Sequence, residues 1–310
     1  MIVQIENLVK RYGDLVALDH LNLNIREGEI FGLLGPNGSG KTTAINCMLS
    51  LLKFDKGSIQ IFGKEMTPFS YDIKRNIGIV MQNVAVFDQL TVYQNVDYFC
   101  GLYVTDKAER QKLVQEAIDF VALGDFVKFR PKKLSGGLLR RLNIACGIAH
   151  KPKLVILDEP TVAVDPQSRN NILEGIRRLN EEGATIIYTS HYMEEIEQLC
   201  TRIAILDKGK VIASGTKEEL KGMITQEEKI VVEAYDVTEA QQEQIRQLGG
   251  VVRTDYNENL LTIYTRNTKS SLVHVLEFIQ ENKIHYGKIS SELPTLNDVF
   301  LEITGKALRD

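Results

Sequence analysis

The sequence predicts a protein of two domains, an α/β domain with a parallel sheet in residues 1–225 and a smaller α+β domain in residues 226–310. Three observations predict this organisation. Short apolar runs alternate with helical stretches and glycine-containing turns through the first domain. After residue 225 the glycine density falls and a different order of strands and helices begins. The chain has 310 residues, of which 44% are hydrophobic, which is enough for two cores and excludes collagen-like and disordered classes.

The first domain contains short apolar runs that fit buried parallel strands, because such strands are covered on both faces and read as continuous apolar sequence. A segment with a turn at Asp207-Lys208-Gly209 predicts a β-hairpin, and two charged, periodic stretches predict helices. The predicted strands are Glu29–Leu34, Leu154–Leu157 and Ala184–Thr189, the hairpin is Arg202–Gly215, and the helices are Asp106–Gly124 and Ser168–Glu182.

The second domain follows the order strand, helix, two strands, helix, strand, which is typical of the ferredoxin-like arrangement. The first helix is closed by Gly249-Gly250, and the hairpin is expected to turn around Asn257. The predicted strands are Glu228–Tyr235, Val251–Asp255, Leu260–Tyr264 and Ile284–Ile289, and the predicted helices are Thr238–Leu248 and Lys269–Asn282.

A glycine-rich segment, Gly35–Thr42 (GPNGSGKT), follows the first predicted strand and precedes an apolar helix predicted over Thr43–Leu52. This spacing in this context is that of a P-loop. Its glycines let successive backbone N–H groups face phosphates, and the helix N-terminus adds a partial positive charge. We expect Lys41 to reach the β- and γ-phosphates of a nucleotide and the Thr42 hydroxyl to bind Mg²⁺.

Polar residues follow two later strands at the edge of the sheet where ligands of open α/β sheets bind. Asp158 and Glu159 end the strand that begins at Leu154, and His191 follows the strand that begins at Ala184. One carboxylate at such a position can hold Mg²⁺, and the next can orient or deprotonate an attacking water. A lone histidine is more often structural, but its place beside these acids favours a role near the γ-phosphate.

Leu134-Ser135-Gly136-Gly137 (LSGG) precedes another helical stretch and forms a second glycine-rich helix N-terminus. Ser135 is also a good helix N-cap, and the two roles are compatible. Two phosphate-binding helix starts are more than one nucleotide needs. The second is therefore expected to serve a nucleotide held by another copy.

In their order along the chain, these motifs resemble the ATP-binding subunit of an ATP-binding-cassette (ABC) transporter, over essentially all of residues 1–225. The segment 35–42 is similar to the Walker A motif, 134–137 to the ABC signature and 154–159 (LVILDE) to Walker B. The resemblance implies a P-loop NTPase cassette with a helical subdomain at about 83–150. It also implies ATP hydrolysis with ATP and Mg²⁺ bound.

The resemblance also implies roles for single residues. Gln82 in IVMQN is similar to the Q-loop glutamine, Tyr12 in KRYG to the aromatic that stacks on adenine, and Asp165 in TVAVDP to the D-loop aspartate. His191 in TSH is similar to the switch histidine, and Glu159 is then the general base. The implied catalytic residues are Glu159, His191 and Gln82, the implied Mg²⁺ ligands are Thr42, Gln82 and Asp158, and the implied nucleotide contacts are Tyr12, Gly35, Pro36, Asn37, Gly38, Ser39, Gly40, Lys41, Thr42, Thr43, Ser135, Gly136, Gly137 and Asp165.

The family works as head-to-tail pairs, so the resemblance implies a second copy of this chain, or a related ATPase subunit, as partner. Each ATP would lie between the Walker A loop of one copy and the signature of the other, which is a two-fold arrangement. Two residues depart from the family pattern: Leu138 follows LSGG, and Ala163 stands where the D-loop often has glycine. Neither change removes a catalytic atom, so we expect a competent ATPase.

Charge, cysteine content and the length of apolar runs indicate the class of partner and the compartment of the protein. The net charge is −4, with 28 basic and 27 acidic residues in 1–225 and 9 and 14 in 226–310, so no nucleic-acid partner is expected. Cys47, Cys100, Cys146 and Cys200 are far apart in sequence, which fits buried thiols in a reducing compartment better than a disulfide framework or a zinc site. No apolar run is long enough to span a bilayer. We expect a cytoplasmic protein, peripheral on the cytoplasmic face of the cell membrane.

The branch of the family is indicated by the C-terminal segment LPTLNDVFLEITG at 293–305, which resembles the ending of bacterial exporter ATPases that handle drugs, peptides, lipids or sodium. An integral membrane permease is the implied partner. The aromatic segment 83–105, with Phe87 and Tyr93, is either the core of the helical subdomain or the groove that receives the permease. An importer ATPase and, more weakly, a soluble non-transport ABC ATPase stay open as alternatives.

Overall fold

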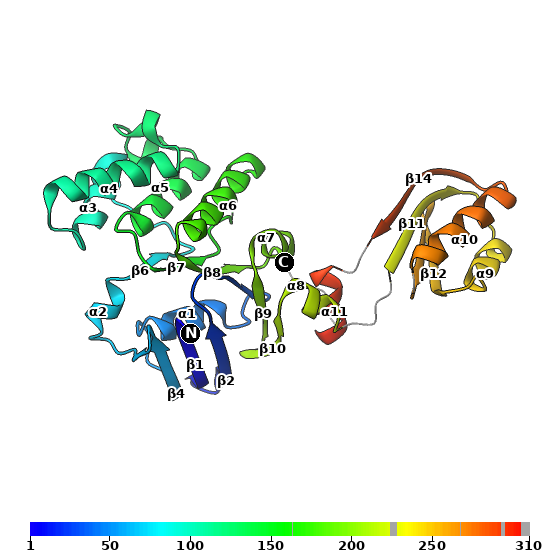
Figure 1. Cartoon of the computed structure of the whole chain (residues 1–310), viewed down its shortest axis with the longest axis horizontal. Coiled ribbons are helices and arrows are strands. Elements are labelled where there is room, and N and C mark those ends of the chain that lie inside the picture. The colour runs from blue at the N-terminus through cyan, green and yellow to red at the C-terminus, as the bar shows by residue number, and fades with distance from the viewer. Residues whose placement is uncertain (163, 224–227, 267, 293–294, 305–310) are drawn as a thin grey trace. The chain divides into compact units, whose positions relative to one another are not determined.

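A computed structural model describes residues 1–162, 164–223, 228–266, 268–292 and 295–304 (Figure 1). The chain divides into two compact units, a cassette unit Met1–Thr216 and a C-terminal unit that begins at Lys217. This division falls earlier in the chain than residue 225, where the sequence analysis sets the domain boundary. Ala163 lies outside the described residues, as do positions 293, 294 and 305 of the C-terminal segment.

The cassette unit is built on a six-stranded sheet in the order β10-β9-β3-β8-β7-β6, in which every neighbouring pair is parallel except β9 with β10. Strands β3, β7 and β8 are buried at every position, which explains their continuous apolar sequence. The bounds are β3 Ile30–Leu34, β6 Ile77–Val80, β7 Leu154–Asp158, β8 Thr185–Ser190, β9 Arg202–Asp207 and β10 Lys210–Gly215. The hairpin turns at Lys208 and Gly209, both with positive φ, as a two-residue turn of this kind requires.

A second, antiparallel sheet in the order β2-β1-β4-β5 was not predicted from the sequence. Strand β1 changes register several times, and Asn7 within it has a φ of 49°, so its apolar residues do not alternate with polar ones. Its strands are β1 Val3–Tyr12, β2 Leu15–Ile25, β4 Lys56–Ile61 and β5 Lys64–Glu65. Residues of both sheets and of helix α1 (Lys41–Met48), including Ile5, Ile45 and Ile156, form one hydrophobic core.

Helices α3, α4 and α5 pack against one another and form a helical layer on one side of the central sheet (Figure 1). Helix α4 is shorter than the predicted Asp106–Gly124, because the chain leaves the helix at Val121 and reverses at Ala122, whose φ is 52°. Helix α6 starts at Pro166 with Asp165 as its N-cap. The helices are α2 Tyr71–Lys74, α3 Val92–Gly101, α4 Lys107–Phe120, α5 Gly136–Ile148, α6 Pro166–Glu181 and α7 Met193–Leu199, with 3₁₀ turns at Gly124–Phe126 and Pro131–Lys133.

The C-terminal unit contains a four-stranded antiparallel sheet in the order β12-β13-β11-β14, which is the strand order of the ferredoxin-like fold. Its core joins the sheet to helices α9 and α10 through residues such as Ile230, Ile245 and Val275. The unit comprises α8 Lys217–Lys221, β11 Glu228–Tyr235, α9 Glu239–Arg246, β12 Val251–Asn257, β13 Leu260–Thr265, α10 Thr268–Glu281, β14 His285–Glu292 and α11 Leu296–Thr304.

Two features of this unit differ from the sequence prediction. The hairpin turns at Glu258 and Asn259, not around Asn257, because these two residues take the positive φ angles that a two-residue turn needs. Helix α11 forms within the exporter-like segment, where the sequence analysis predicted no element, and it buries Leu296, Val299 and Phe300.

The four cysteines are free and buried. Among the described residues of the whole chain, no helix is both long and apolar enough to span a membrane.

Candidate nucleotide site at the edge of the parallel sheet

The loop between β3 and α1 leaves no room for a side chain at Gly35 or Gly40. A Cβ at Gly35 would lie 2.3 Å from the Leu206 carbonyl oxygen. At Gly40, whose φ is 109°, it would lie 2.8 Å from the Ala17 carbonyl oxygen. Only glycine fits these positions without backbone movement. The loop therefore curls tightly over the first turn of α1, where backbone N–H groups are free to meet an anion.

Lys41 is the first residue of α1, and its ammonium group is buried within the site. Its Nζ atom donates to the carbonyl oxygens of Gly35, at 2.7 Å, and Pro36, at 3.2 Å, and lies 3.4 Å from Glu159 Oε1. Burial lowers the pKa of the Lys41 ammonium below its usual value, while the charge of Glu159 opposes that shift. Its two carbonyl contacts hold the ammonium group over the loop.

Asp158 is fully buried at the end of β7 and is held by two hydroxyl groups. Thr42 Oγ1 donates to Asp158 Oδ2 at 3.0 Å, and Thr189 Oγ1 donates to Asp158 Oδ1 at 2.6 Å. Thr189 is the residue beside Asp158 in the neighbouring strand β8. The sequence analysis missed Thr189. The available signal was a polar residue at the end of an otherwise apolar buried strand.

Glu159 lies at the centre of the site and has a φ of 48°. This backbone conformation is uncommon for a residue with a side chain and is held here by its own N–H group, which donates to Thr189 Oγ1 at 3.0 Å. Gln82 Nε2 donates to Glu159 Oε2 at 3.1 Å, and His191 Nδ1 lies 3.5 Å from Glu159 Oε1. The structure thus brings Lys41, Gln82, Glu159 and His191 together from four separate segments.

The loop that carries Gln82 is attached to helix α5 by two residues that the sequence analysis missed. The Arg140 guanidinium donates to the carbonyl oxygens of Met81, at 3.1 Å, and Gln82, at 2.7 Å. Asn143 Oδ1 accepts from the backbone N–H of Ala85 at 3.1 Å. Arg140 and Asn143 are both buried, although polar residues of a helix usually face solvent. Because α5 begins at the LSGG segment, these contacts join that segment to the Gln82 loop.

Ser135 and Asp165 are N-caps of α5 and α6. Ser135 Oγ accepts from Leu138 N at 3.3 Å, and Asp165 Oδ1 accepts from Ser168 N at 2.9 Å. The Ser168 backbone N–H also lowers the pKa of the Asp165 carboxyl. A Cβ at Gly137 would lie 2.6 Å from Ser168 Oγ, so the two helix starts pack closely. Ser135 and Asp165 thus cap the starts of α5 and α6, whereas Lys41 is the first residue of α1.

The remaining predicted contacts surround the loop or lie at its border. Tyr12 ends β1, is 49% exposed and has Lys10 Nζ 5.1 Å from its ring centre. Ser39 is buried, and its Oγ atom has no hydrogen-bond partner among the described residues. Pro36 and Asn37 precede the tight turn at Gly38, and Thr43 follows Thr42 in α1.

The residues fit a nucleotide with Mg²⁺ on three grounds. First, Gly35 and Gly40 keep side chains away from the loop. Second, Ser39 Oγ is a buried polar atom without a hydrogen-bond partner among the described residues. Third, Thr42 and Asp158 offer the hard oxygen ligands that Mg²⁺ prefers.

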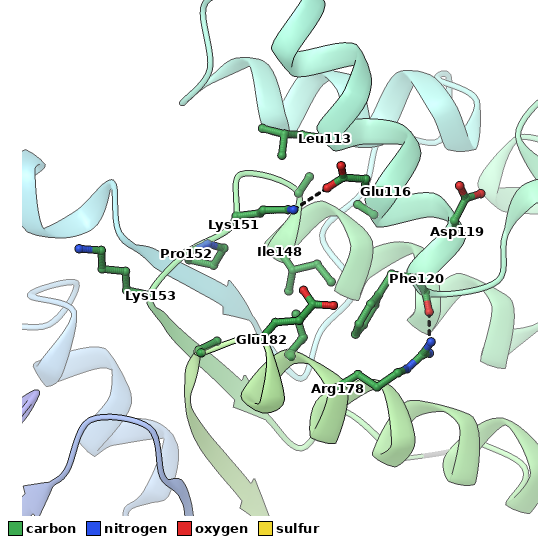
Figure 2. A pocket seen from close by; sticks show the side chains of 15 residues that line it. Leu113, Glu116, Asp119, Phe120, Ile148, Lys151, Pro152, Lys153, Arg178 and Glu182 are labelled. Carbon is green, nitrogen blue, oxygen red and sulfur yellow. Dashed lines mark hydrogen bonds and ion pairs between the residues drawn. The ribbon is translucent and has the colours of Figure 1, made fainter.

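A pocket of about 840 Å³ lies elsewhere, between α4, the end of α5 and α6. Figure 2 shows that Glu116 and Lys151 pair across part of it and that Arg178 donates to the Phe120 carbonyl oxygen. None of the predicted nucleotide residues lines it. This pocket is therefore separate from the nucleotide residues.

Two family models match the chain. The model described as ABC transporter matches residues 18–162, and the model described as ATP-binding protein DrrA1-3-like, C-terminal domain, matches residues 215–304. The linearmycin resistance ATP-binding protein LnrL of Bacillus subtilis is 38% identical, with all of both chains covered. The daunorubicin/doxorubicin resistance ATP-binding protein DrrA of Streptomyces peucetius is 33% identical over 99% of this chain and 94% of its own. The Nod factor export ATP-binding protein I of Ralstonia nicotianae is 34% identical over 100% and 95%.

Solved structures agree with these relatives. A dimeric ATP-binding cassette in a post-hydrolysis state with ADP and Pi superposes with a TM-score of 0.63 at 29% identity, covering 69% of this chain and 98% of its own. The C-terminal match also coincides with the separate unit that begins at Lys217. On the motifs, the geometry and full-length relatives above 30% identity, the chain belongs to the ATP-binding subunits of ABC transporters, which hydrolyse ATP to power transport.

Proposed function

We propose that this chain powers export through a separate membrane permease by Mg²⁺-dependent ATP hydrolysis at Glu159. The observation that carries the catalytic part is the contact of Glu159 with Lys41, Gln82 and His191 at one edge of the sheet. The direction of transport is supported by full-length relatives named as drug-resistance and Nod factor export proteins.

Each residue around Glu159 has a distinct proposed task. Glu159 accepts a proton from the attacking water, because its carboxylate oxygens lie beside Gln82 and His191, the two side chains proposed to act on that water and on the γ-phosphate. Gln82 orients that water, and His191 contacts the γ-phosphate and balances its charge. Binding of a triphosphate competes with Glu159 for the Lys41 ammonium and thereby releases the carboxylate to act as a base.

Thr42, Asp158 and Gln82 are the proposed Mg²⁺ contacts. Thr42 and Asp158 are already hydrogen-bonded to one another, and Thr189 fixes the second Asp158 oxygen. When bound, Mg²⁺ supplies positive charge that neutralises phosphate oxygens. The task of Thr189 is to hold the Asp158 carboxylate in one orientation, as outer hydrogen bonds do at other metal sites.

A second copy, or a related ATPase subunit, is proposed to complete the site. Ser135, Gly136 and Gly137 form the glycine-rich start of α5, a different helix from α1, which Lys41 starts. In a two-fold, head-to-tail pair, this helix start would meet the phosphates bound by the partner's loop. Asp165 packs against Gly137 and would adjoin the same interface.

Aromatic residues of the helical layer are the proposed permease contact, which would hold the protein at the cytoplasmic face of the membrane. Phe87 and Tyr98 are 42% and 47% exposed and pack edge to face at 4.9 Å. Asn95 fixes the Phe87 backbone by accepting from its N–H and donating to its C=O. An exposed aromatic cluster on a fixed backbone is suited to a partner helix.

The catalytic proposal is tested by Glu159→Gln in the full chain, coexpressed with the permease that co-purifies with it. We expect kcat for ATP hydrolysis to fall about 10²- to 10⁴-fold, because amide oxygens do not take the proton of water, while ATP still binds. Glu174→Gln, on the exposed side of α6, is the matched control and should keep wild-type turnover. Unchanged turnover in Glu159→Gln would contradict the proposal.

The permease proposal is tested by Phe87→Asp, with Val273→Asp on the exposed side of α10 as the control. We expect Phe87→Asp to lose co-purification of the integral membrane protein and to keep ATP binding, because Phe87 lies outside the nucleotide residues. Val273→Asp should retain the complex. Full recovery of the membrane protein with Phe87→Asp would show that this cluster is only part of the helical core.

A further inference from the structure

Glu195 on α7 is a buried carboxylate to which the nucleotide site assigns no task. Its side chain is 3% exposed, and its Oε2 atom accepts three hydroxyl hydrogen bonds. The donors are Thr161 at 2.8 Å, Tyr188 at 2.7 Å and Ser190 at 3.0 Å. Burial raises the pKa of the Tyr188 hydroxyl well above its usual value, so this donor keeps its proton. Burying a carboxylate costs free energy, which these hydrogen bonds offset. A carboxylate buried at that cost is a candidate for a functional role.

Arg169 connects Glu195 to the helix that starts at the D-loop. It lies in the first turn of α6, and its backbone N–H donates to the Asp165 carbonyl oxygen at 2.9 Å. Its Nε atom is 3.3 Å from Glu195 Oε1, yet neither atom has a hydrogen-bond partner among the described residues. A small shift of α6 would convert this contact into a charge-assisted hydrogen bond or break it.

Ser190 connects the same carboxylate to the switch histidine. Its Oγ atom donates to Glu195 and accepts from the backbone N–H of Tyr192 at 2.9 Å, so it fixes the chain on both sides of His191. The Tyr192 ring lies 4.1 Å from the His191 ring, and the Arg169 guanidinium carbon lies 5.0 Å from the Tyr192 ring centre. Arg169 therefore contacts both the carboxylate and the aromatic ring that flank the histidine.

We propose that Glu195 and Arg169 are positioning residues that set the orientation of His191 and transmit movement of the D-loop helix to it. The path runs from Asp165 through Arg169 to Glu195 and Tyr192, and then to His191, whose Nδ1 lies 3.5 Å from Glu159 Oε1. The Arg169–Glu195 contact, which a small shift of α6 would tighten or break, is the element through which this transmission would act. The inference rests on the proposed function of His191 and Glu159.

The test compares Arg169→Ala, Arg169→Lys and Glu195→Gln in the full chain, coexpressed with its co-purifying permease. We expect Arg169→Ala to lower kcat about 10- to 100-fold, because a misplacement of about 1 Å at a catalytic group has that effect, with KM for ATP within about twofold of wild type. Arg169→Lys keeps a cation near Glu195 Oε1 and the Tyr192 ring and should recover kcat to within about threefold. Glu195→Gln keeps the side-chain size and should resemble Arg169→Ala.

The double variant Arg169→Ala/Glu195→Gln separates positioning from general destabilisation. Residues that act as one unit are non-additive, so the double variant should be no slower than the slower single variant. The proposal is overturned if Arg169→Ala keeps wild-type kcat, if its KM rises as kcat falls, if Arg169→Lys gives no recovery, or if the two losses multiply. Failure of the proposed function is distinct, because there the Glu159→Gln variant itself would turn over normally.

Discussion

The cassette unit buries charged side chains, whereas the described part of the C-terminal unit does not. Buried polar residues of the C-terminal unit are the hydroxyl residues Thr254, Thr265 and Ser271. The ion pair between Lys229 and Asp298 in this unit has both side chains partly exposed. In the cassette unit the buried charged residues are Lys41, Arg140, Asp158, Glu159 and Glu195.

The difference shows where function constrains the sequence. Burying an unpaired charge costs several kcal/mol, so a fold that needs only stability fills its interior with apolar and hydroxyl groups. The five buried charges among the described residues of the cassette lie in or beside the nucleotide site or the loops attached to it. Charge burial therefore marks the unit that holds the nucleotide residues.

Among the comparisons between the two units, the largest expected effect comes from removing the cation of the buried Lys41–Glu159 pair. Lys41→Met keeps the length of the side chain but leaves Glu159 without its ammonium partner and the phosphates without their cation. We expect kcat for ATP hydrolysis to fall about 10²- to 10³-fold, the loss found when one charged donor to a transition state is removed. Turnover is measured by phosphate release at saturating ATP.

The matched variant Lys229→Met breaks the Lys229–Asp298 pair of the C-terminal unit, whose atoms are 2.6 Å apart. Because both side chains are about a quarter exposed, we expect a stability loss of at most about 1 kcal/mol and unchanged turnover. A comparable fall of kcat in both variants would contradict the distinction between the two units.

The sequence was enough to predict which residues meet at this edge of the sheet, because the motif residues lie at strand ends and helix starts. The parallel strands end at one edge, and this brings Lys41 and Glu159 from distant segments to within 3.4 Å. The resemblance to the family supplied Gln82, which donates to Glu159 in the structure. The order of elements was also enough for the sheet of the C-terminal unit.

The residues that the sequence did not reveal act through long-range contacts or broken periodicity. Arg140 and Asn143 hold the Gln82 loop from about sixty positions further along the chain, and no local pattern indicates that pairing. Strand β1 was missed because its bulges interrupt the alternation of apolar and polar residues. Pairings of this kind become visible only when the chain has folded.

We expect an effect of intermediate size on the pH dependence of stability from His150 of the cassette unit, for which the C-terminal unit offers an exposed counterpart. Burial against Tyr103, whose ring lies 3.9 Å away, lowers the pKa of His150 from 6.5 to about 4. The unfolded chain then binds a proton that the folded chain does not between pH 6.5 and 4, so stability falls as the pH is lowered through that range. We expect a loss of about 2 kcal/mol between pH 7 and pH 5 from this group.

Urea unfolding at pH 7 and pH 5 measures this loss, with His150→Gln as the variant that lacks it. The exposed His274 of the C-terminal unit provides the matched variant His274→Gln, which should keep the wild-type pH dependence. If His150→Gln were as pH-sensitive as the wild type, His150 would not be buried in its neutral form.

The smallest expected effect comes from removing two helix caps that make the same backbone hydrogen bond. Ser135 caps α5 in the cassette unit and Thr238 caps α9 in the C-terminal unit, each accepting a backbone N–H three residues on at 3.3 Å. Ser135→Ala and Thr238→Ala should each lower stability by about 1 kcal/mol, as loss of a cap does elsewhere. Only Ser135→Ala should also lower ATP turnover, because the Ser135 hydroxyl is proposed to meet phosphate across the dimer. Equal turnover in the two variants would reduce Ser135 to a cap and leave the second helix start without a ligand.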